Sequence, residues 1–239
     1  MAISLAVKGM QHDAMKLFKE ALSGYQKLDD TSNIVQVYMN MSILFSNLED
    51  RKNIKIYSYR TMSLGKKIPN DSIMSIVYSN YVLANQNISQ DSLKYYRAKS
   101  NLIAEKFKDT KVLMINRLDE ASKFIIVKDK NTALPILTSI LSEARKLGID
   151  YAELMALGAL SNLYNNEPKT AMTYSEEALA VARKGGFSYF EPLILQEMLH
   201  YAEILQDVSK QLEIAKKLVA ATSIQQRQLQ LFFGRLYAL

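Results

Sequence analysis

Six segments of this chain carry the same arrangement of small and apolar residues at nearly constant intervals. The first five segments begin with a small or apolar residue and the sixth begins with Gln211, and residues four and seven positions later lie on the same helical face. The segments start at Ala14, Ile54, Ser92, Ala133, Ala171 and Gln211, which gives a period of about 40 residues. A repeat of this length predicts stacked supersecondary units rather than one closed core.

Helix is the regular structure that the rest of the chain favours. Only 8 Gly and 4 Pro interrupt 239 residues, and apolar residues recur three and four positions apart between polar breaks. The short apolar run FIIV at 124–127 has some strand character, but we interpret it as a buried helical face. The ten polar breaks predict roughly eleven helices, arranged as about six helical hairpins in an all-α solenoid.

The repeated segments resemble the tetratricopeptide repeat (TPR) family, a helix-turn-helix unit of about 34 residues. Ala14, Phe18 and Ala21 match the Ala, Phe and Ala of its second helix, and Leu157-Gly158 matches the Leu-Gly pair of its first helix. Tyr38, Met41, Ser42 and Phe45 also occupy first-helix positions. The chain departs from the family in its longer period and its lack of Trp. The resemblance implies a right-handed α-α superhelix, as in divergent bacterial TPR arrays of sensors and regulators.

The two ends of the chain differ from the units between them. In the repeat register Gly9 falls at the turn of the first hairpin, so we expect the first helix to begin about half-way along and Met1 to be a cut end. We assign 1–207 to the repeats and 208–239 to the last helix of the sixth repeat and a capping or linker helix. This long helix is predicted to be amphipathic through Ile224, Leu229, Leu231, Phe232, Leu236 and Leu239.

Composition and motifs argue against catalysis. The absence of cysteine excludes disulfides, thiolate nucleophiles and zinc-thiolate sites. There is no glycine-rich phosphate loop or nucleophile elbow, and Lys184-Gly185-Gly186 is typical of a helix end. Glu197, His200 and Glu203 resemble half of a di-iron site, but the other half is missing, which favours a plain polar face. We therefore expect no enzymatic activity, no cofactor and no metal.

Asparagines in the first helices are the candidate binding residues. Asn40, Asn80 and Asn116 are assigned to one inward-facing position of units two, three and four, although asparagine is a weak helix former. A carboxamide suits the N–H and C=O groups of an extended peptide. The resemblance implies the same, because peptide-binding TPR proteins carry an asparagine ladder there; solvated polar positions are the alternative. The same face is assigned Gln36, Asn47, Gln86, Asn87, Asp119 and Lys123, together with Ile43, Ile76 and Leu83.

The expected partner is therefore a protein or peptide segment, with no small-molecule substrate. The formal charge of +6 is scattered in pairs such as Lys66-Lys67, which argues against nucleic acid. Two alternatives stay open: an assembly scaffold that dimerises through the final helix, and an RNA-binding helical array whose tyrosines stack on bases. The tyrosines are more simply interpreted as packing between units.

The sequence lacks the signals of a membrane or secreted protein. No apolar run of about eighteen residues occurs, so we expect no membrane span. The lysine of MAISLAVKGM follows the apolar residues, which is the wrong order for a secretory signal. We expect a cytoplasmic location, with an exported or membrane-tethered parent protein as the alternative.

Overall fold

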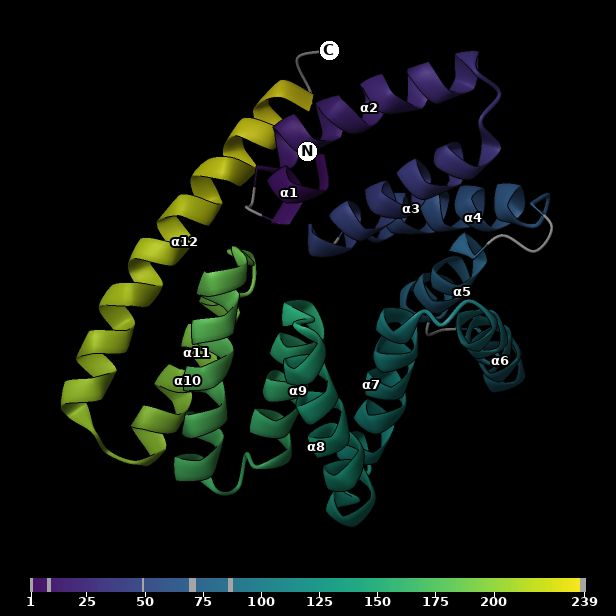
Figure 1. Cartoon of the computed structure of the whole chain (residues 1–239). Helices are drawn as coiled ribbons and strands as arrows, with labels where there is room; N and C mark the ends of the chain where they lie inside the picture. Colours follow the sequence, from purple (N-terminus) through teal and green to yellow (C-terminus); the bar gives the residue numbers. More distant parts are fainter. Residues whose placement is uncertain (1, 8–9, 49, 69–71, 86–87, 237–239) are drawn as a thin grey trace. The chain divides into compact units, whose positions relative to one another are not determined.

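The computed structural model describes residues 2–7, 10–48, 50–68, 72–85 and 88–236 (Figure 1). These residues form helices and turns and no strand, so the all-α class is confirmed for them. The roughly eleven predicted helices correspond to α2 to α12, and a short α1 precedes them. The helices are α1 (Ala2–Val7), α2 (Gln11–Lys27), α3 (Thr31–Asn47), α4 (Arg51–Gly65), α5 (Ile73–Ala84), α6 (Gln90–Lys106), α7 (Thr110–Ile126), α8 (Lys130–Leu147), α9 (Asp150–Leu163), α10 (Pro168–Gly185), α11 (Glu191–Ile204) and α12 (Val208–Leu236).

The helix boundaries reproduce the repeat. The even-numbered helices from α2 to α12 begin at Gln11, Arg51, Gln90, Lys130, Pro168 and Val208, so their starts keep the same period as the sequence motif. The small residues that mark the repeat are buried where helices meet: Ala14, Ala133 and Ala171 are all 0% exposed. A larger side chain at these positions would force neighbouring helices apart. The small residues of the repeat therefore mark the places where neighbouring helices pack together.

One type of turn recurs at six described helix ends. Its left-handed residue is glycine in two places and a residue with a β-carbon in four: Gly148, Gly186, Asp29, Lys108, Lys128 and Gln206. The next residue donates its backbone N–H to the carbonyl five residues earlier, as Asp129 does to Phe124 at 2.8 Å. This is the Schellman arrangement, which satisfies carbonyls at the helix end. Four of the turns then continue into an aspartate that accepts a hydrogen bond from a backbone N–H of the next helix, namely Asp30, Asp109, Asp129 and Asp207.

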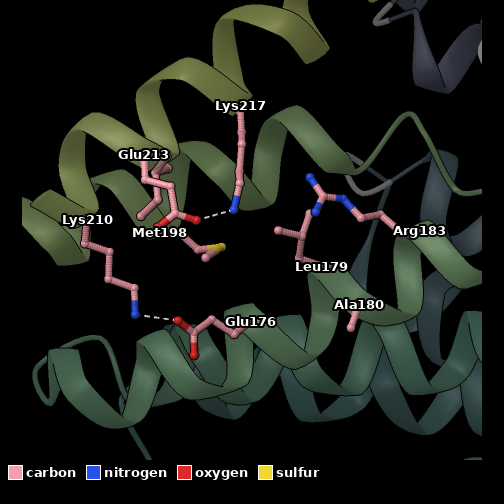
Figure 2. Close-up of a pocket in the computed structure, with 9 residues that line it drawn as sticks. Glu176, Leu179, Ala180, Arg183, Met198, Lys210, Glu213 and Lys217 are labelled. Atoms are coloured by element: carbon pink, nitrogen blue, oxygen red, sulfur yellow. Dashed lines mark hydrogen bonds and ion pairs between the residues drawn. The ribbon is translucent and has the colours of Figure 1, made fainter.

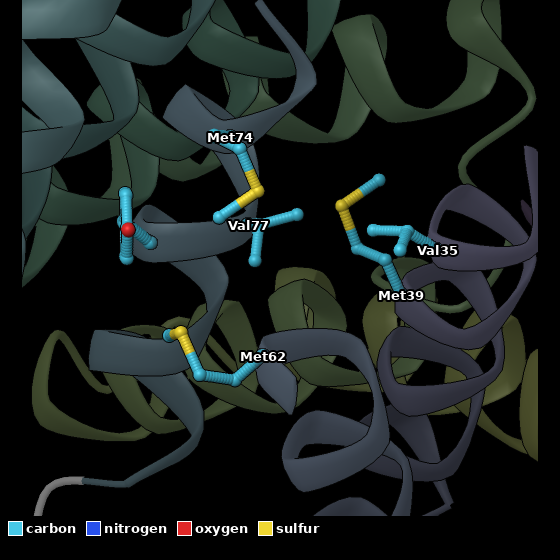
Figure 3. Close-up of a cluster of buried hydrophobic side chains, with 6 residues drawn as sticks. Val35, Met39, Met62, Met74 and Val77 are labelled. Atoms are coloured by element: carbon cyan, nitrogen blue, oxygen red, sulfur yellow. The ribbon is translucent and has the colours of Figure 1, made fainter. Parts of the chain in front are cut away.

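The helices form two compact units. The first comprises residues 1–6 and 11–116, and the second comprises residues 7–10 and 117–239; α7 continues from one into the other. In the first unit α3 packs against α4 and α5 against α6, while α3 also contacts α5 (Figure 1). Figure 3 shows a core cluster of the first unit. Its buried residues are Val35, Met39, Met62, Met74, Val77 and Tyr78.

A chain of polar side chains joins three helices inside the first unit. Asn116 of α7 is 5% exposed, and its Nδ2 donates to Ser100 Oγ at 2.8 Å and to Asn101 Oδ1 at 2.7 Å, both on α6. Ser100 Oγ donates in turn to the Ser75 carbonyl of α5 at 2.7 Å. Because each donor finds an acceptor, this joint is buried without leaving its amide nitrogen unpaired.

In the second unit, successive helices pack from α8 to α12, and α10 and α11 lie alongside each other in Figure 1. An ion pair recurs across two turns at the period of the repeat. Arg145 Nε lies 2.8 Å from Glu153 Oε1, and Arg183 Nε lies 2.8 Å from Glu191 Oε1. Both arginines are nearly half exposed, so these pairs align helix ends more than they stabilise the fold.

Some predicted features differ in the structure, and others lie outside the described residues. The run at 124–127 is helical up to Ile126, but it is not a buried face, because Ile126 and Val127 are 77% and 69% exposed beside the α7–α8 turn. Gly186 ends α10 in the left-handed region, as expected. Gly9 and the side chains that would make the end of α12 amphipathic are outside the described residues. Among the described helices, none combines the length and apolarity of a membrane span.

Candidate functional site

A shallow groove in the first unit crosses the N-terminal ends of α3 and α5, each the first helix of a hairpin. It has a volume of about 350 Å³ and is called the α3–α5 groove below. Its lining comes from α3, from the start of α5 and from the residue before α7: Ser32, Asn33, Gln36, Ser72, Ile73, Ile76 and Asp109. Gln36, a predicted binding residue, is exposed here, and Ile76 was assigned to the same face. The groove offers carboxamide, hydroxyl and carboxylate groups beside two isoleucines.

The same face continues along both helices beyond the groove. Asn40 and Ile43 follow Gln36 by four and seven residues, as Asn80 and Leu83 follow Ile76, so each set shares one helical face. Ile43 is 40% exposed and Leu83 is 43% exposed. An asparagine and then an exposed apolar residue therefore occur at matching positions on two helices that contact each other.

The two asparagines on this face are half-buried, and Asn80 has an unused donor. Its Nδ2 is buried and has no hydrogen-bond partner among the described residues. A buried donor without a partner costs about 1–3 kcal/mol, so this nitrogen favours any acceptor that can reach it.

Asn116 does not share their position. Asn40 and Asn80 precede the start of the next helix by nearly the same number of residues. Asn116 precedes the start of α8 by about one helical turn more. The Asn116 amide lies in the joint with α6. Its nitrogen already donates to Ser100 and Asn101, so this donor is engaged within the protein, and a role of Asn116 in binding stays a prediction.

The other predicted residues contribute less to a common surface. Gln86, Asn87 and the side chain of Asn47 lie outside the described residues. Asp119 and Lys123 are half-buried in the part of α7 that belongs to the second unit, and each already interacts with another group of the chain. Their role in binding stays a prediction.

The groove residues missed from sequence lie at helix starts. The polar breaks between helices contain Ser32, Asn33, Ser72 and Asp109. Helical spacing does not extend into these breaks, so it could not assign their side chains to a face. A signal was present, because serine and aspartate are typical of helix N-termini. Asp109 both caps a helix and lines the groove. Its Oδ1 accepts a hydrogen bond from the Val112 N–H at 3.2 Å, and its carboxylate belongs to the groove lining.

A second hollow, of about 330 Å³, lies between α10, α11 and α12 in the second unit (Figure 2). Its charged residues are paired within the protein. Lys210 Nζ lies 2.5 Å from Glu176 Oε1, Lys217 pairs with Glu213, and Arg183 pairs with Glu191. Since its basic side chains are already compensated, this hollow offers less to a charged ligand than the first unit does.

The three residues that resemble half of a di-iron site, Glu197, His200 and Glu203, all lie on α11. Among the described residues, no three histidine, cysteine, aspartate or glutamate side chains are grouped so that they could hold a metal ion. Glu197, His200 and Glu203 are all exposed on that helix.

No protein-family model matches this chain, and a comparison with curated proteins found no match. The resemblance to TPR proteins therefore stays a prediction from the residues quoted above.

Proposed function

We propose that this chain is a protein-interaction module that binds an extended peptide segment along the face of α3 and α5. The observation that supports this most is the correspondence of two contacting helices one repeat apart. Gln36 and Ile76 line one groove, Asn40 and Asn80 follow one turn later, and exposed Ile43 and Leu83 follow next.

The chemistry of this face fits a peptide backbone. Asparagine can donate to a carbonyl and accept from an N–H, so two of them can hold a segment with little regard to its side chains. Ile43 and Leu83 add apolar contact, which favours a peptide with alternate apolar residues. A right-handed superhelix of TPR-like units is the arrangement that we propose for the repeats. By the same resemblance, the wider setting would be the sensory or interaction part of a bacterial signalling or transcriptional regulator.

Selection from a phage-displayed library of random peptides tests the proposal, with a synthetic copy of the enriched peptide as the probe. The double variant Asn40→Ala/Asn80→Ala should bind that peptide about tenfold more weakly by calorimetry, since each lost hydrogen bond is worth about 0.5–1.5 kcal/mol. Asn131→Ala, an exposed asparagine on α8, is the matched control and should leave affinity unchanged.

A second set of probes tests whether the protein binds the backbone of the peptide. Methylating single backbone nitrogens of the enriched peptide removes donors without changing its side chains. At least one such probe should bind tenfold more weakly to the wild type and lose no further affinity on the double variant. Enrichment of no peptide, or equal affinity of the wild type and the double variant, would contradict the proposal.

A further inference from the structure

A cleft in the first unit has a lining unlike that of the α3–α5 groove. It lies between the end of α4, α5 and α6, has a volume of about 470 Å³, and is called the Tyr–Lys cleft below. Its lining residues are three tyrosines, two lysines and a set of apolar residues: Tyr78, Tyr95, Tyr96, Lys66, Lys99, Gly65, Ile68, Met74, Leu102 and Ile103. Its volume falls within the range of small-molecule sites, about 300–1,000 Å³.

The base of the cleft is buried and its rim is exposed. Met74 and Tyr78 are 3% and 8% exposed and belong to the core cluster of Figure 3. Tyr95 and Leu102 on α6 are 54% and 68% exposed although both are largely apolar. A buried apolar base beside exposed, largely apolar walls favours a ligand that covers those walls.

The aromatic rings of the cleft support one another. Tyr96 stacks on Tyr78 at 5.7 Å between ring centroids and meets Tyr95 edge-on at 5.2 Å. In this arrangement the rings present both faces and edges to a flat ligand. An aromatic ring is the group that such walls fit best.

Both lysines of the cleft lack a carboxylate partner among the described residues, and the lining contains no acidic residue. Lys99 Nζ lies 4.7 Å from the Tyr95 ring centroid and 5.8 Å from that of Tyr78. A hydrogen bond with Tyr95 raises the pKa of Lys99, so its charged form is the one that the cleft holds. Two uncompensated positive charges beside apolar walls are complementary to a negative charge.

We propose that the Tyr–Lys cleft binds a small aromatic anion, with its ring against Tyr95, Tyr96 and Leu102 and its carboxylate or phosphate near Lys66 and Lys99. This site is separate from the peptide face. Met74 and Tyr78 lie on α5 roughly opposite Ile73 and Ile76, since a helix turns about 100° per residue. The proposal therefore does not depend on the peptide-binding function.

Four probes distinguish the chemistry by calorimetry: 2-naphthoate, 2-naphthyl phosphate, neutral 2-naphthalenemethanol and aliphatic octanoate. We expect at least one of the two aromatic anions to bind at least fivefold more tightly than both the neutral and the aliphatic probe. The tighter of the two aromatic anions identifies carboxylate or phosphate as the preferred group. Equal affinity for the neutral alcohol would overturn the role of charge, and equal affinity for octanoate would overturn the role of the ring.

Variants locate the binding. Lys66→Gln/Lys99→Gln should weaken the tighter aromatic anion about fivefold or more without changing the affinity for the neutral alcohol, while Tyr95→Leu should weaken all three aromatic probes. Lys94→Gln, an exposed lysine on the same helix, is the matched control. All four substituted positions are at least partly exposed, and circular dichroism checks that each variant folds.

A structural readout completes the test. With ¹³C-methyl methionine, the Met74 resonance, assigned through Met74→Leu, should shift on adding the tighter aromatic anion because the ring lies beside it. Binding without a shift of Met74, or binding unaffected by the double lysine variant, would place the ligand elsewhere and overturn the proposal.

Discussion

At the scale of single residues, Asn116 shows how a predicted ligand-binding side chain can instead hold helices together. Its amide nitrogen lies in the joint between α6 and α7 and donates to Ser100 and Asn101. The first of these bonds continues to the Ser75 carbonyl of α5. A substitution here therefore acts on folding.

We expect Asn116→Ala to lower the free energy of unfolding by about 1–3 kcal/mol, because it leaves buried polar partners unpaired. Urea denaturation followed by circular dichroism measures this loss. The exposed Asn131→Ala should change the stability by less than about 0.5 kcal/mol. A loss at Asn116 no larger than that at Asn131 would show that the buried chain of polar groups contributes nothing.

Gly158 is the glycine of the Leu-Gly pair that carries part of the TPR resemblance. A glycine in this position would be expected to admit a neighbouring helix, yet a β-carbon added at Gly158 meets no atom within 4 Å. We therefore expect Gly158→Ala to stabilise the protein by about 0.5–1 kcal/mol through helix propensity alone. Thermal unfolding measures the change, and a destabilised variant would show that the helix needs glycine for close packing.

At the scale of helices and turns, the left-handed residues define where hairpins bend. Lys128 adopts φ 60° and Gly148 φ 65° in turns of the same kind. The strain of a residue with a β-carbon in this region is about 1 kcal/mol. We expect Lys128→Gly to raise the stability by up to that amount and Gly148→Ala to lower it by about the same, both measured by denaturation. Changes of equal sign would contradict this account.

Aspartates at helix starts make the stability depend on pH. The Thr132 hydroxyl, and then its backbone N–H, lower the pKa of Asp129, and the amide of Asn33 does the same for Asp30. A lowered folded-state pKa favours the ionised form, so the stabilisation is present above the ordinary value of 3.8 and is lost as the pH falls through the folded-state pKa.

Asp129→Asn keeps an acceptor at the helix start but does not titrate. We expect it to be less stable than the wild type near neutral pH, with the difference shrinking as the pH falls below about 4. Urea denaturation across this range measures it, and Asp30→Asn should behave in the same way. A constant difference at every pH would mean that the charge of Asp129 does not act at the cap.

The helices were predictable from sequence because apolar spacing and polar breaks are local signals. The phase of a side chain within a helix was harder to predict. Asn40, Asn80 and Asn116 were all assigned to one inward-facing position, whereas the Asn116 amide lies in the joint with α6. The Tyr–Lys cleft was not predictable at all, because its walls come from three helices whose approach depends on packing.

At the scale of the whole molecule, contacts between neighbouring helices predominate within each unit. Stability in such chains is a sum of local terms, so damage in one part need not spread. Leu195 of α11 is 0% exposed, and Leu195→Ala should cost about 2–5 kcal/mol. Hydrogen exchange should then show lost protection in α10 to α12 and unchanged protection in α3 to α6. Equal loss throughout would indicate one cooperative fold.

The recurring bend between helices also bears on how such a protein can change in length. The left-handed residue of this bend is lysine, glutamine, aspartate or glycine, so the bend does not require one particular residue type at that position. Unequal recombination between two such bends one period apart, for example those at Lys108 and Gly148, would add or remove a complete hairpin and recreate the same bend where the segments join. The length of a protein built in this way can therefore evolve in whole steps of one hairpin.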